Sequence, residues 1–151
     1  MTITLSPGII MTGLAGASIC LVPIRANQTE LVRIDYMSCC VENISLCIAQ
    51  NADKTYSFSD NSGVDFSAAT EISFTIWESR GDGVLVLDKT LSAGDITLAS
   101  PTVFQLHVTH DDSSAMTPTR KYCEVWVTLL GGEQRLTGAG HYLVEDTRKF
   151  D

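Results

Sequence analysis

One short run of the chain, HVTHDD at positions 107–112, has side chains that could bind a metal ion. Imidazole nitrogens and carboxylate oxygens are common ligands of zinc and other divalent cations. In an extended strand, however, His107 and His110 point to opposite faces, and the sequence identifies no further ligands that would converge with either of them. The run is therefore interpreted as a solvated strand end, and no metal site is predicted.

A second run, DNSGVD at positions 60–65, has oxygen-bearing side chains at part of the spacing of a calcium-binding loop. Glu71 stands where such a loop has its bidentate glutamate, counted from Asp60. Asn61 and Val64 break the alternation that the other ligand positions require. A turn is the better interpretation of this run.

Catalytic groups do not form a recognisable constellation. No serine, histidine and aspartate surround a nucleophile elbow, and nothing resembles a cysteine–histidine site with an oxyanion donor. The remaining histidine, His141, is expected at the surface of the last predicted strand. We therefore predict that the protein is not an enzyme and requires no cofactor.

Two tryptophans and one loop tip are candidate contact residues. Trp77 and Trp126 are predicted to point outward, with Tyr122 nearby, and could contact a protein or stack on a sugar; a protein interface is favoured. The run Arg80-Gly81-Asp82 spells a tripeptide that integrins recognise on a loop tip. These three are also ordinary hairpin residues, and a hairpin turn is the favoured interpretation.

Charge and cysteine content limit the partners. The chain has 10 Lys and Arg against 18 Asp and Glu, a formal charge of −8, and its cations do not cluster, so we expect no nucleic-acid partner. The five cysteines are an odd number, and Cys39 and Cys40 are adjacent. This arrangement suits neither a disulfide framework nor a metal knuckle, and mostly buried, reduced thiols are predicted.

The first 24 residues contain no charged side chain. A secretion signal would begin with Lys or Arg, and a membrane span would not be interrupted so often by proline and glycine. We therefore expect no export signal and no membrane segment, and assembly inside a cell. The interrupting residues are Pro7, Gly8, Gly13, Gly16 and Pro23.

The elements that would position these residues are short strands. From Ile44 onward, apolar and polar residues alternate in runs separated by turn residues. RGDG at 80–83 and Gly131-Gly132 supply the glycines of two hairpins, and Asp111–Met116 could form one helical turn capped by Asp111. The fold class predicted is an all-β antiparallel sandwich. Its strands are expected at 44–48, 54–59, 71–79, 84–91, 96–98, 103–109, 122–130 and 135–144.

The first 43 residues differ from the rest in composition, so we divide the chain into an N-terminal attachment arm, 1–43, and a β-sandwich domain, 44–151. The arm has only five charged side chains, with possible strands at Ile19–Ile24 and Glu30–Tyr36. A weakly charged segment too short for its own core needs another surface to cover it. The arm residues predicted at an assembly interface are Ile9, Ile10, Met11, Leu14, Ile19, Leu21, Val22 and Ile24.

Several motifs match a known module. DFSAAT at 65–70 is similar to an Asp-Leu-Thr-Gly-Ala-Thr turn that enters a strand, and 72–77 and 88–91 follow as that module's strands do. Residues 122–127, Gly131-Gly132, Gly138 and Thr147-Arg148 are similar to its closing hairpin. With these motifs, residues 44–148 resemble an immunoglobulin-like β-sandwich module of tailed-phage virion proteins, found in upper-baseplate N-terminal domains and in fibre and decoration proteins. Ala68 and Thr119-Arg120-Lys121 depart from it, because glycines are expected at those two places.

The resemblance implies a non-enzymatic virion protein, made and assembled in the host cytoplasm. Its partners would be the major capsid or tail proteins of the same virion and further copies of itself, with a trimer as the expected symmetry. A capsid decoration protein is favoured, because the chain ends almost at the sandwich. The alternatives are a tail, baseplate or fibre adaptor, a host-surface or carbohydrate-binding adhesin, and a small secreted domain stabilised by disulfides.

Overall fold

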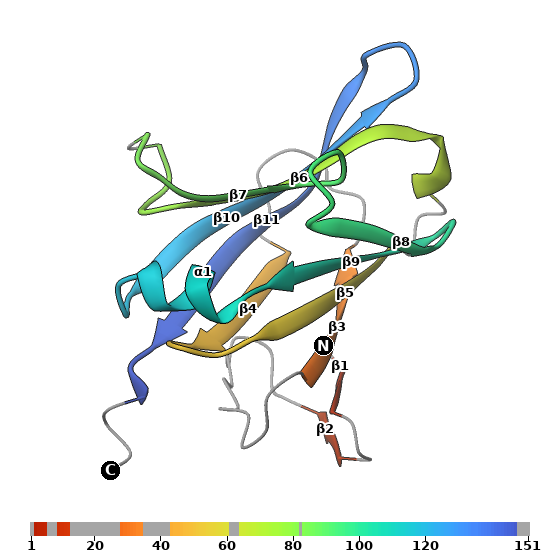
Figure 1. Ribbon diagram of the computed structural model, residues 1–151. Helices are drawn as coiled ribbons and strands as arrows, with labels where there is room; N and C mark the ends of the chain where they lie inside the picture. The colour runs from red at the N-terminus through yellow and green to blue at the C-terminus, as the bar shows by residue number, and fades with distance from the viewer. Residues whose placement is uncertain are drawn as a thin grey trace.

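The computed structural model describes residues 2–5, 9–12, 28–34, 43–60, 64–81 and 83–147 (Figure 1). Almost all of this structure is β-strand, and two sheets pack face to face around one core. The predicted all-β sandwich is therefore confirmed. The strands are β1 (Thr2–Leu5), β2 (Ile9–Thr12), β3 (Gln28–Ile34), β4 (Ile44–Ala49), β5 (Lys54–Asp60), β6 (Ala69–Trp77), β7 (Leu85–Thr90), β8 (Ile96–Ser100), β9 (Val103–Val108), β10 (Arg120–Leu129) and β11 (Gln134–Glu145), with a 3₁₀ turn η1 (Phe66–Ala68) and one helix α1 (His110–Ala115).

The strand order is β4-β11-β10-β6-β7 in the larger sheet and β3-β5-β9-β8 in the smaller one, while β1 and β2 pair with each other. Most neighbours are antiparallel, as predicted. At one edge of each sheet, however, the pairing is parallel: β4 runs parallel to β11, and β3 runs parallel to β5. Both sheets are therefore mixed, and their parallel edge strands both come from the first third of the chain.

Alternation along the strands builds the core. Ile72, Phe74 and Ile76 of β6 are fully buried, and Val125 and Val127 of β10 face the same core. Each such side chain contributes about 1.5–3 kcal/mol by leaving water. Aromatic rings fill the space between the sheets, with the rings of Phe58 and Phe104 stacked at 4.8 Å and Phe66 edge-on to Phe104 at 5.0 Å.

The predicted turns adopt the expected backbone conformations. Gly81 and Gly83 in the β6–β7 hairpin have φ values of +85° and +76°, and Gly131 and Gly132 in the β10–β11 hairpin have +105° and +85°. Side chains other than glycine avoid this region, so glycine is the natural residue at all four positions. Figure 1 shows both hairpins extending beyond the body of the sandwich.

The helix α1 begins one residue earlier than predicted. Its N-cap is Thr109, whose hydroxyl accepts from the backbone of Asp112 while the Asp112 carboxylate accepts from the Thr109 backbone. This reciprocal capping box explains why Asp111 is not the cap. Asp112 also forms an ion pair with Lys89 of β7 at 2.8 Å, and Asp95 approaches the same ammonium at 3.2 Å. These contacts join an edge strand of the larger sheet to the helix.

One strand has a register that the sequence did not predict. Leu87 of β7 lies opposite Ile76 of β6, but the next pair joins Leu85 to Trp77, because the register shifts by one residue between them. A bulge of this kind moves the following side chain to the other face of the sheet. Simple alternation over the predicted strand 84–91 would place Leu85 and Leu87 on one face, but the bulge separates them and Leu85 is 47% exposed.

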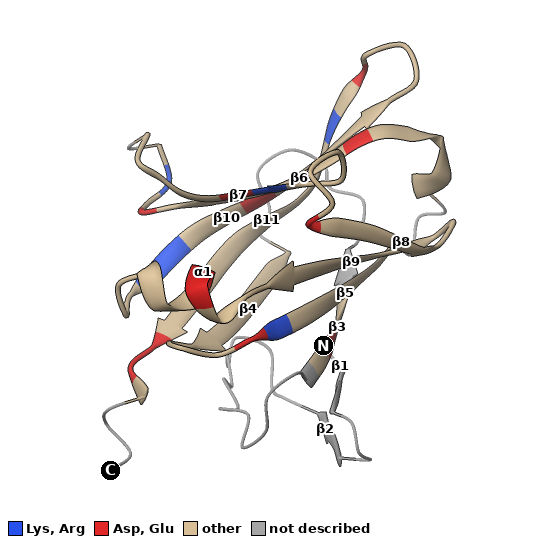
Figure 2. Ribbon diagram, in the orientation of Figure 1, with Lys and Arg blue, Asp and Glu red and all other residues tan. Residues whose placement is uncertain are grey.

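The basic residues that the structure describes are spread over several strands and loops (Figure 2). Among the described residues there is also no helix that is long and apolar enough to cross a membrane.

Candidate assembly interface

Strand β3 links the N-terminal segment to the sandwich. It pairs with β5 in parallel over its whole length, from Gln28 opposite Lys54 to Ile34 opposite Asp60. Along β3, Val32 is buried at 3% exposure and contacts the core, whereas Leu31 is 54% exposed. These two neighbours point to opposite faces, as successive residues of a strand do. β3 therefore adds Val32 to the core and presents Leu31 away from it.

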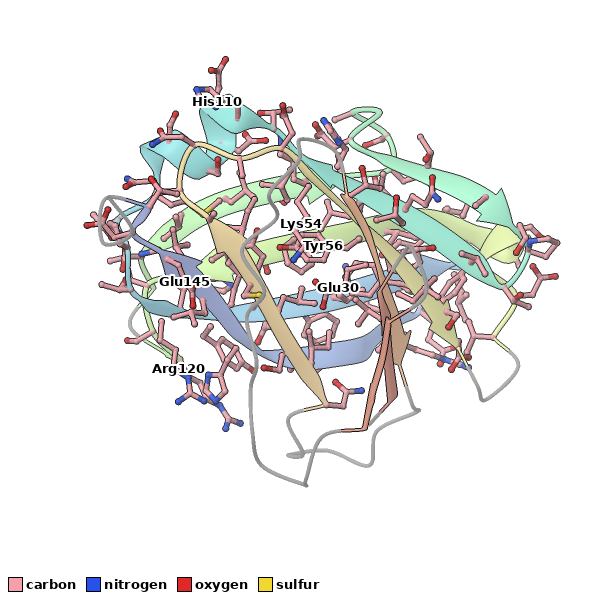
Figure 3. The ribbon with its side chains drawn as sticks, turned by 90° about the horizontal axis from the view of Figure 1, so that it is seen from below. Glu30, Lys54, Tyr56, His110, Arg120 and Glu145 are labelled. Atoms are coloured by element: carbon pink, nitrogen blue, oxygen red, sulfur yellow. The ribbon has the colours of Figure 1, made fainter. Side chains whose placement is uncertain are left out.

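A buried ion pair joins β3 to β5. The ammonium of Lys54 lies 2.6 Å from the Glu30 carboxylate and donates to the Cys47 carbonyl at 2.7 Å. The side chains of Lys54 and Glu30 are only 6% and 15% exposed. The ammonium also lies 5.1 Å from the ring centroid of Tyr56. Figure 3 shows Glu30, Lys54 and Tyr56 together between the edge strands β4 and β3. A charge this deep is tolerated only when it is paired and hydrogen-bonded, so β3 supplies a partner that the sandwich needs.

Two tyrosines continue this polar cluster into the core. The Tyr56 hydroxyl donates to the Cys47 carbonyl at 2.8 Å and lies 3.1 Å from the hydroxyl of Tyr142 on β11. Burial raises the pKa of Tyr56 well above its ordinary value, and the neighbouring acidic groups, the Tyr142 phenol and the Glu30 carboxylate, raise it further. Burial also raises the pKa of Tyr142. Both phenols therefore stay neutral and act as hydrogen-bonding bridges between β4, β5 and β11. We refer to Glu30, Lys54, Tyr56, Tyr142 and the Cys47 carbonyl as the seam.

The cysteines differ from the prediction in part. Cys47 is disulfide-bonded, so the expectation of reduced thiols is wrong for this residue. Cys123 is not part of a disulfide and is fully buried in the core, as predicted for a reduced thiol. The other three, Cys20, Cys39 and Cys40, lie outside the described residues.

The two candidate tryptophans lie on the outer face of the larger sheet, as predicted. Trp77 of β6 is opposite Tyr122 of β10, and Trp126 lies further along β10. The Trp77 indole donates to the Thr75 hydroxyl at 3.1 Å, and the Trp126 indole donates to the Glu124 carboxylate at 3.0 Å. Both rings are partly buried and are held against their own strands. Their role in contact with another molecule stays a prediction.

The loop-tip candidates fall on the β6–β7 hairpin. Arg80 is exposed, and its guanidinium lies 5.7 Å from the ring centroid of Tyr122. It therefore packs back onto the sheet face. Asp82 lies outside the described residues, so the geometry of the tripeptide is not described.

The apolar residues assigned to the arm interface are placed only in part. Ile9, Ile10 and Met11 belong to β2, which pairs antiparallel with β1. Leu14, Ile19, Leu21, Val22 and Ile24 lie outside the described residues, as does the strand predicted at 19–24. The division of the chain at residue 43 also stays a prediction, although β3 shows that part of the arm belongs to the smaller sheet.

The histidine-rich run does not converge on one point. His110 lies 2.8 Å from the carbonyl of Asn51, whereas the ring nitrogen of His107 lies 3.1 Å from the hydroxyl of Thr55. Within the part of the chain that the structure describes, no three side chains of His, Cys, Asp or Glu are placed to hold a metal ion.

Comparison with known proteins gives a likeness to solved structures. No protein-family model matches the sequence, and no curated protein matches it. Among solved structures, the chain is similar to the N-terminal domain of phage TP901-1 ORF48, with a TM-score of 0.52 and 12% sequence identity. The match covers 78% of this chain and 98% of the phage chain. At this identity the likeness shows a shared fold.

Sequence reasoning missed the seam. The sequence contained one hint that Glu30 is unusual, because it is one of only five charged residues among the first 43 and stands in an alternating run. Lys54 was assigned to a strand but was not recognised as buried. Nothing in the sequence alone indicated that these two residues, 24 positions apart, would meet through a parallel pairing.

Proposed function

We propose that this chain is a structural protein of a bacteriophage virion, attached to its particle through the N-terminal segment. The observation that carries this proposal is the likeness to a phage protein domain, which the chain matches over 98% of that domain's length. The motifs at 65–91 and 122–138 support it independently, because they point to the same kind of module from sequence.

The seam supports attachment by strand addition. β3 joins the sandwich through a backbone ladder and one buried ion pair, and it comes from the segment that precedes the regular strand series. Strand addition gives affinity through main-chain hydrogen bonds, while a few side chains fix the register. We expect the residues that precede β3 to bind a neighbouring protein in a similar way, which would hold the sandwich on a particle without a large side-chain epitope.

Within the virion, we place the protein on the capsid as a decoration protein that contacts the major capsid protein and further copies of itself, as a trimer. A tail, baseplate or fibre adaptor is the second candidate. One observation favours it: the phage neighbour is described as an N-terminal domain, which is one module of a longer protein. An adhesin is less well supported, because Trp77 and Trp126 are partly buried and do not form a free stacking platform.

Electron microscopy of purified particles with a gold label at the C-terminus of this chain tests the proposal. We expect the chain to be present in the particles in many copies, with the label distributed over the head. A label confined to the tail would replace decoration with the adaptor function. If mass spectrometry finds no copies of the chain in gradient-purified particles, the virion role is wrong.

A further inference from the structure

Strand β8 forms one end of the smaller sheet, where β9 is its neighbour among the strands that the structure describes. Just before β8, the carbonyl of Asp95 accepts a hydrogen bond from the backbone N–H of His107, at 3.2 Å. In an antiparallel pair, residues that bond the neighbouring strand alternate with residues whose backbone groups point away from it. Thr97 therefore bonds β9 in the same register, and the backbone groups of Ile96 and Leu98 point to the open edge.

The middle of β8 is open to solvent, since Thr97, Leu98 and Ala99 are all exposed. Side chains two residues apart share a face of a sheet, so Leu98 points the same way as Ile96, which is 1% exposed. Leu98 is also the register partner of Phe104, a fully buried core residue. Leu98 is nevertheless 40% exposed. The apolar face of the smaller sheet therefore continues to its edge and ends there uncovered.

The outer strand of the larger sheet, β7, has features that this part of β8 lacks. Lys89 of β7 lies opposite the buried Phe74, on the core face, and its side chain is only 11% exposed. The register of β7 also shifts near its start. An inward-pointing charge and a bulge both hinder a further strand from pairing with an edge. β8 has no charged side chain in Ile96–Ser100, and its register shifts only beyond Leu98, so its edge can accept a strand at 96–98.

A second copy of β8 fits this edge, because the strand is complementary to itself. In an antiparallel pair centred on Thr97, Ile96 of each copy lies opposite Leu98 of the other, and the two Thr97 residues face each other. Apolar pairs and Thr–Thr pairs in such positions stabilise a sheet. The outward backbone groups of both strands are then hydrogen-bonded. Asp95 lies opposite Ala99 of the other copy, so no like charges meet, which matters for a chain with a formal charge of −8.

We propose that β8 pairs with β8 of a second copy across a two-fold axis at Thr97, which joins the two smaller sheets into one. The contact is short and buries less than about 1,200 Å², the lower limit of stable interfaces, so it is weak. Purified protein should dimerise only at about 0.1 mM and above. The inference goes beyond the virion role and does not rest on it, because it concerns purified protein and a part of the chain distant in sequence from the N-terminal segment.

A cysteine at the proposed axis tests the pairing and its register. The two Thr97 residues would form a non-hydrogen-bonded pair with Cα atoms about 4.5 Å apart, within the range that a disulfide spans. On mild oxidation, Thr97→Cys should form a covalent dimer of twice the 16.4 kDa chain mass, at least tenfold above the background that the native cysteines give in the wild type. Intact mass spectrometry without reductant measures it.

Ala99→Cys is the matched control for Thr97→Cys. Ala99 is exposed on the same strand, but the proposed register places the two copies of it about 13 Å apart, so it should stay at the wild-type background. Equal cross-linking of both variants would show random collision and refute the pairing. Cross-linking of neither variant, or of Ala99→Cys alone, would refute the two-fold axis at Thr97.

A charge at the edge gives a second readout that needs no cross-link. At about 0.5 mM, sedimentation equilibrium should show dimers for the wild type and monomers for Leu98→Glu, with the unfolding midpoint little changed because Leu98 is already 40% exposed. Leu130→Glu, on the β10–β11 hairpin at 84% exposure, should dimerise like the wild type. Monomers of the Leu130 variant together with dimers of the Leu98 variant would place the contact elsewhere. A wild type that stays monomeric, with Thr97→Cys cross-linking instead to another protein of purified particles, would assign the edge to that protein and end the proposal.

Discussion

The side chain of Lys54 is almost fully buried, and the carboxylate of Glu30 balances the charge of its ammonium. Replacing Glu30 by Gln removes that compensation and leaves a buried ammonium. We predict a loss of about 3 kcal/mol in the free energy of unfolding, because one partner of a buried pair is removed while the other stays. Urea unfolding followed by tryptophan fluorescence measures it.

The matched control for Glu30→Gln is Glu133→Gln at the exposed Glu133–Arg135 pair, whose side chains are 61% and 41% exposed. That substitution should not move the unfolding midpoint measurably, because solvent screens such pairs. Equal effects of the two substitutions would show that the seam does not hold β3.

Lys89 and Asp112 make the stability depend on pH. Burial alone would raise the pKa of Asp112, but hydrogen bonds from Lys89 and Thr109 outweigh it and hold that pKa below its usual range. Burial would likewise lower the pKa of Lys89, whereas hydrogen bonds to Asp112 and Asp95 raise it. A depressed carboxyl pKa gives stability that is present above the unfolded value of about 3.9 and is lost as the pH falls further.

The raised pKa of Lys89 gives stability that is complete below the unfolded value of about 10.4 and is lost as the pH rises through the folded value.

Because the pKa of Asp112 is lowered in the folded protein, the wild type should lose more stability between pH 5 and pH 2.5 than the Asp112→Asn variant does. Denaturation midpoints at the two pH values measure this difference. The same loss in both proteins would contradict the role of Asp112.

At the level of strands, the close approach of β4 to β11 can be tested through one glycine. A Cβ on Gly140 would overlap the backbone carbonyl of Ile44, in the parallel pair of these strands. We predict that Gly140→Ala costs about 3 kcal/mol or prevents folding, because the obstacle is backbone and cannot turn away.

Gly132→Ala is the control for Gly140→Ala. Gly132 has open space around its Cβ position and a φ of +85°, so alanine should cost only about 1 kcal/mol there. Thermal unfolding of both variants compares them. A smaller effect at Gly140 than at Gly132 would mean that β4 does not pair with β11 as described.

Strand positions were predictable where one face is buried. From β4 to β11, the predicted runs agree with the observed strands to within a few residues, because period-2 alternation and turn glycines determine both. The helix start differed because the capping box of Thr109 and Asp112 outcompeted Asp111. The position of Leu85 could not be predicted, since a one-residue bulge leaves no mark in the alternation.

The pairing partners of the edge strands were not predictable. Alternation shows that a strand has a buried face, but it does not say which strand lies beside it or in which direction. The parallel placement of β3 on β5, and of β4 on β11, depends on contacts between residues far apart in sequence. The seam follows from those pairings, so the candidate site could be only partly anticipated, through the unusual composition of the first 43 residues.

At the scale of the whole molecule, we propose a sandwich that is attached to its particle through its N-terminal segment. β3 shows how that segment engages a sheet edge, and a virion is the setting that we propose for such attachment. In this account, the residues before β3 act between proteins, whereas β3 itself is also needed for the fold. Removing the residues before β3 should therefore abolish attachment without preventing folding.

The most direct test is incorporation of a chain that lacks residues 2–24 but keeps β3 and the seam. Full-length and truncated chains are produced during particle assembly, and gradient-purified particles are assayed for each by quantitative mass spectrometry. We predict that the truncated chain folds, with an unfolding midpoint close to that of the full chain, and is at least tenfold depleted from the particles. Incorporation of the truncated chain at the level of the full-length chain would contradict attachment through the N-terminal segment.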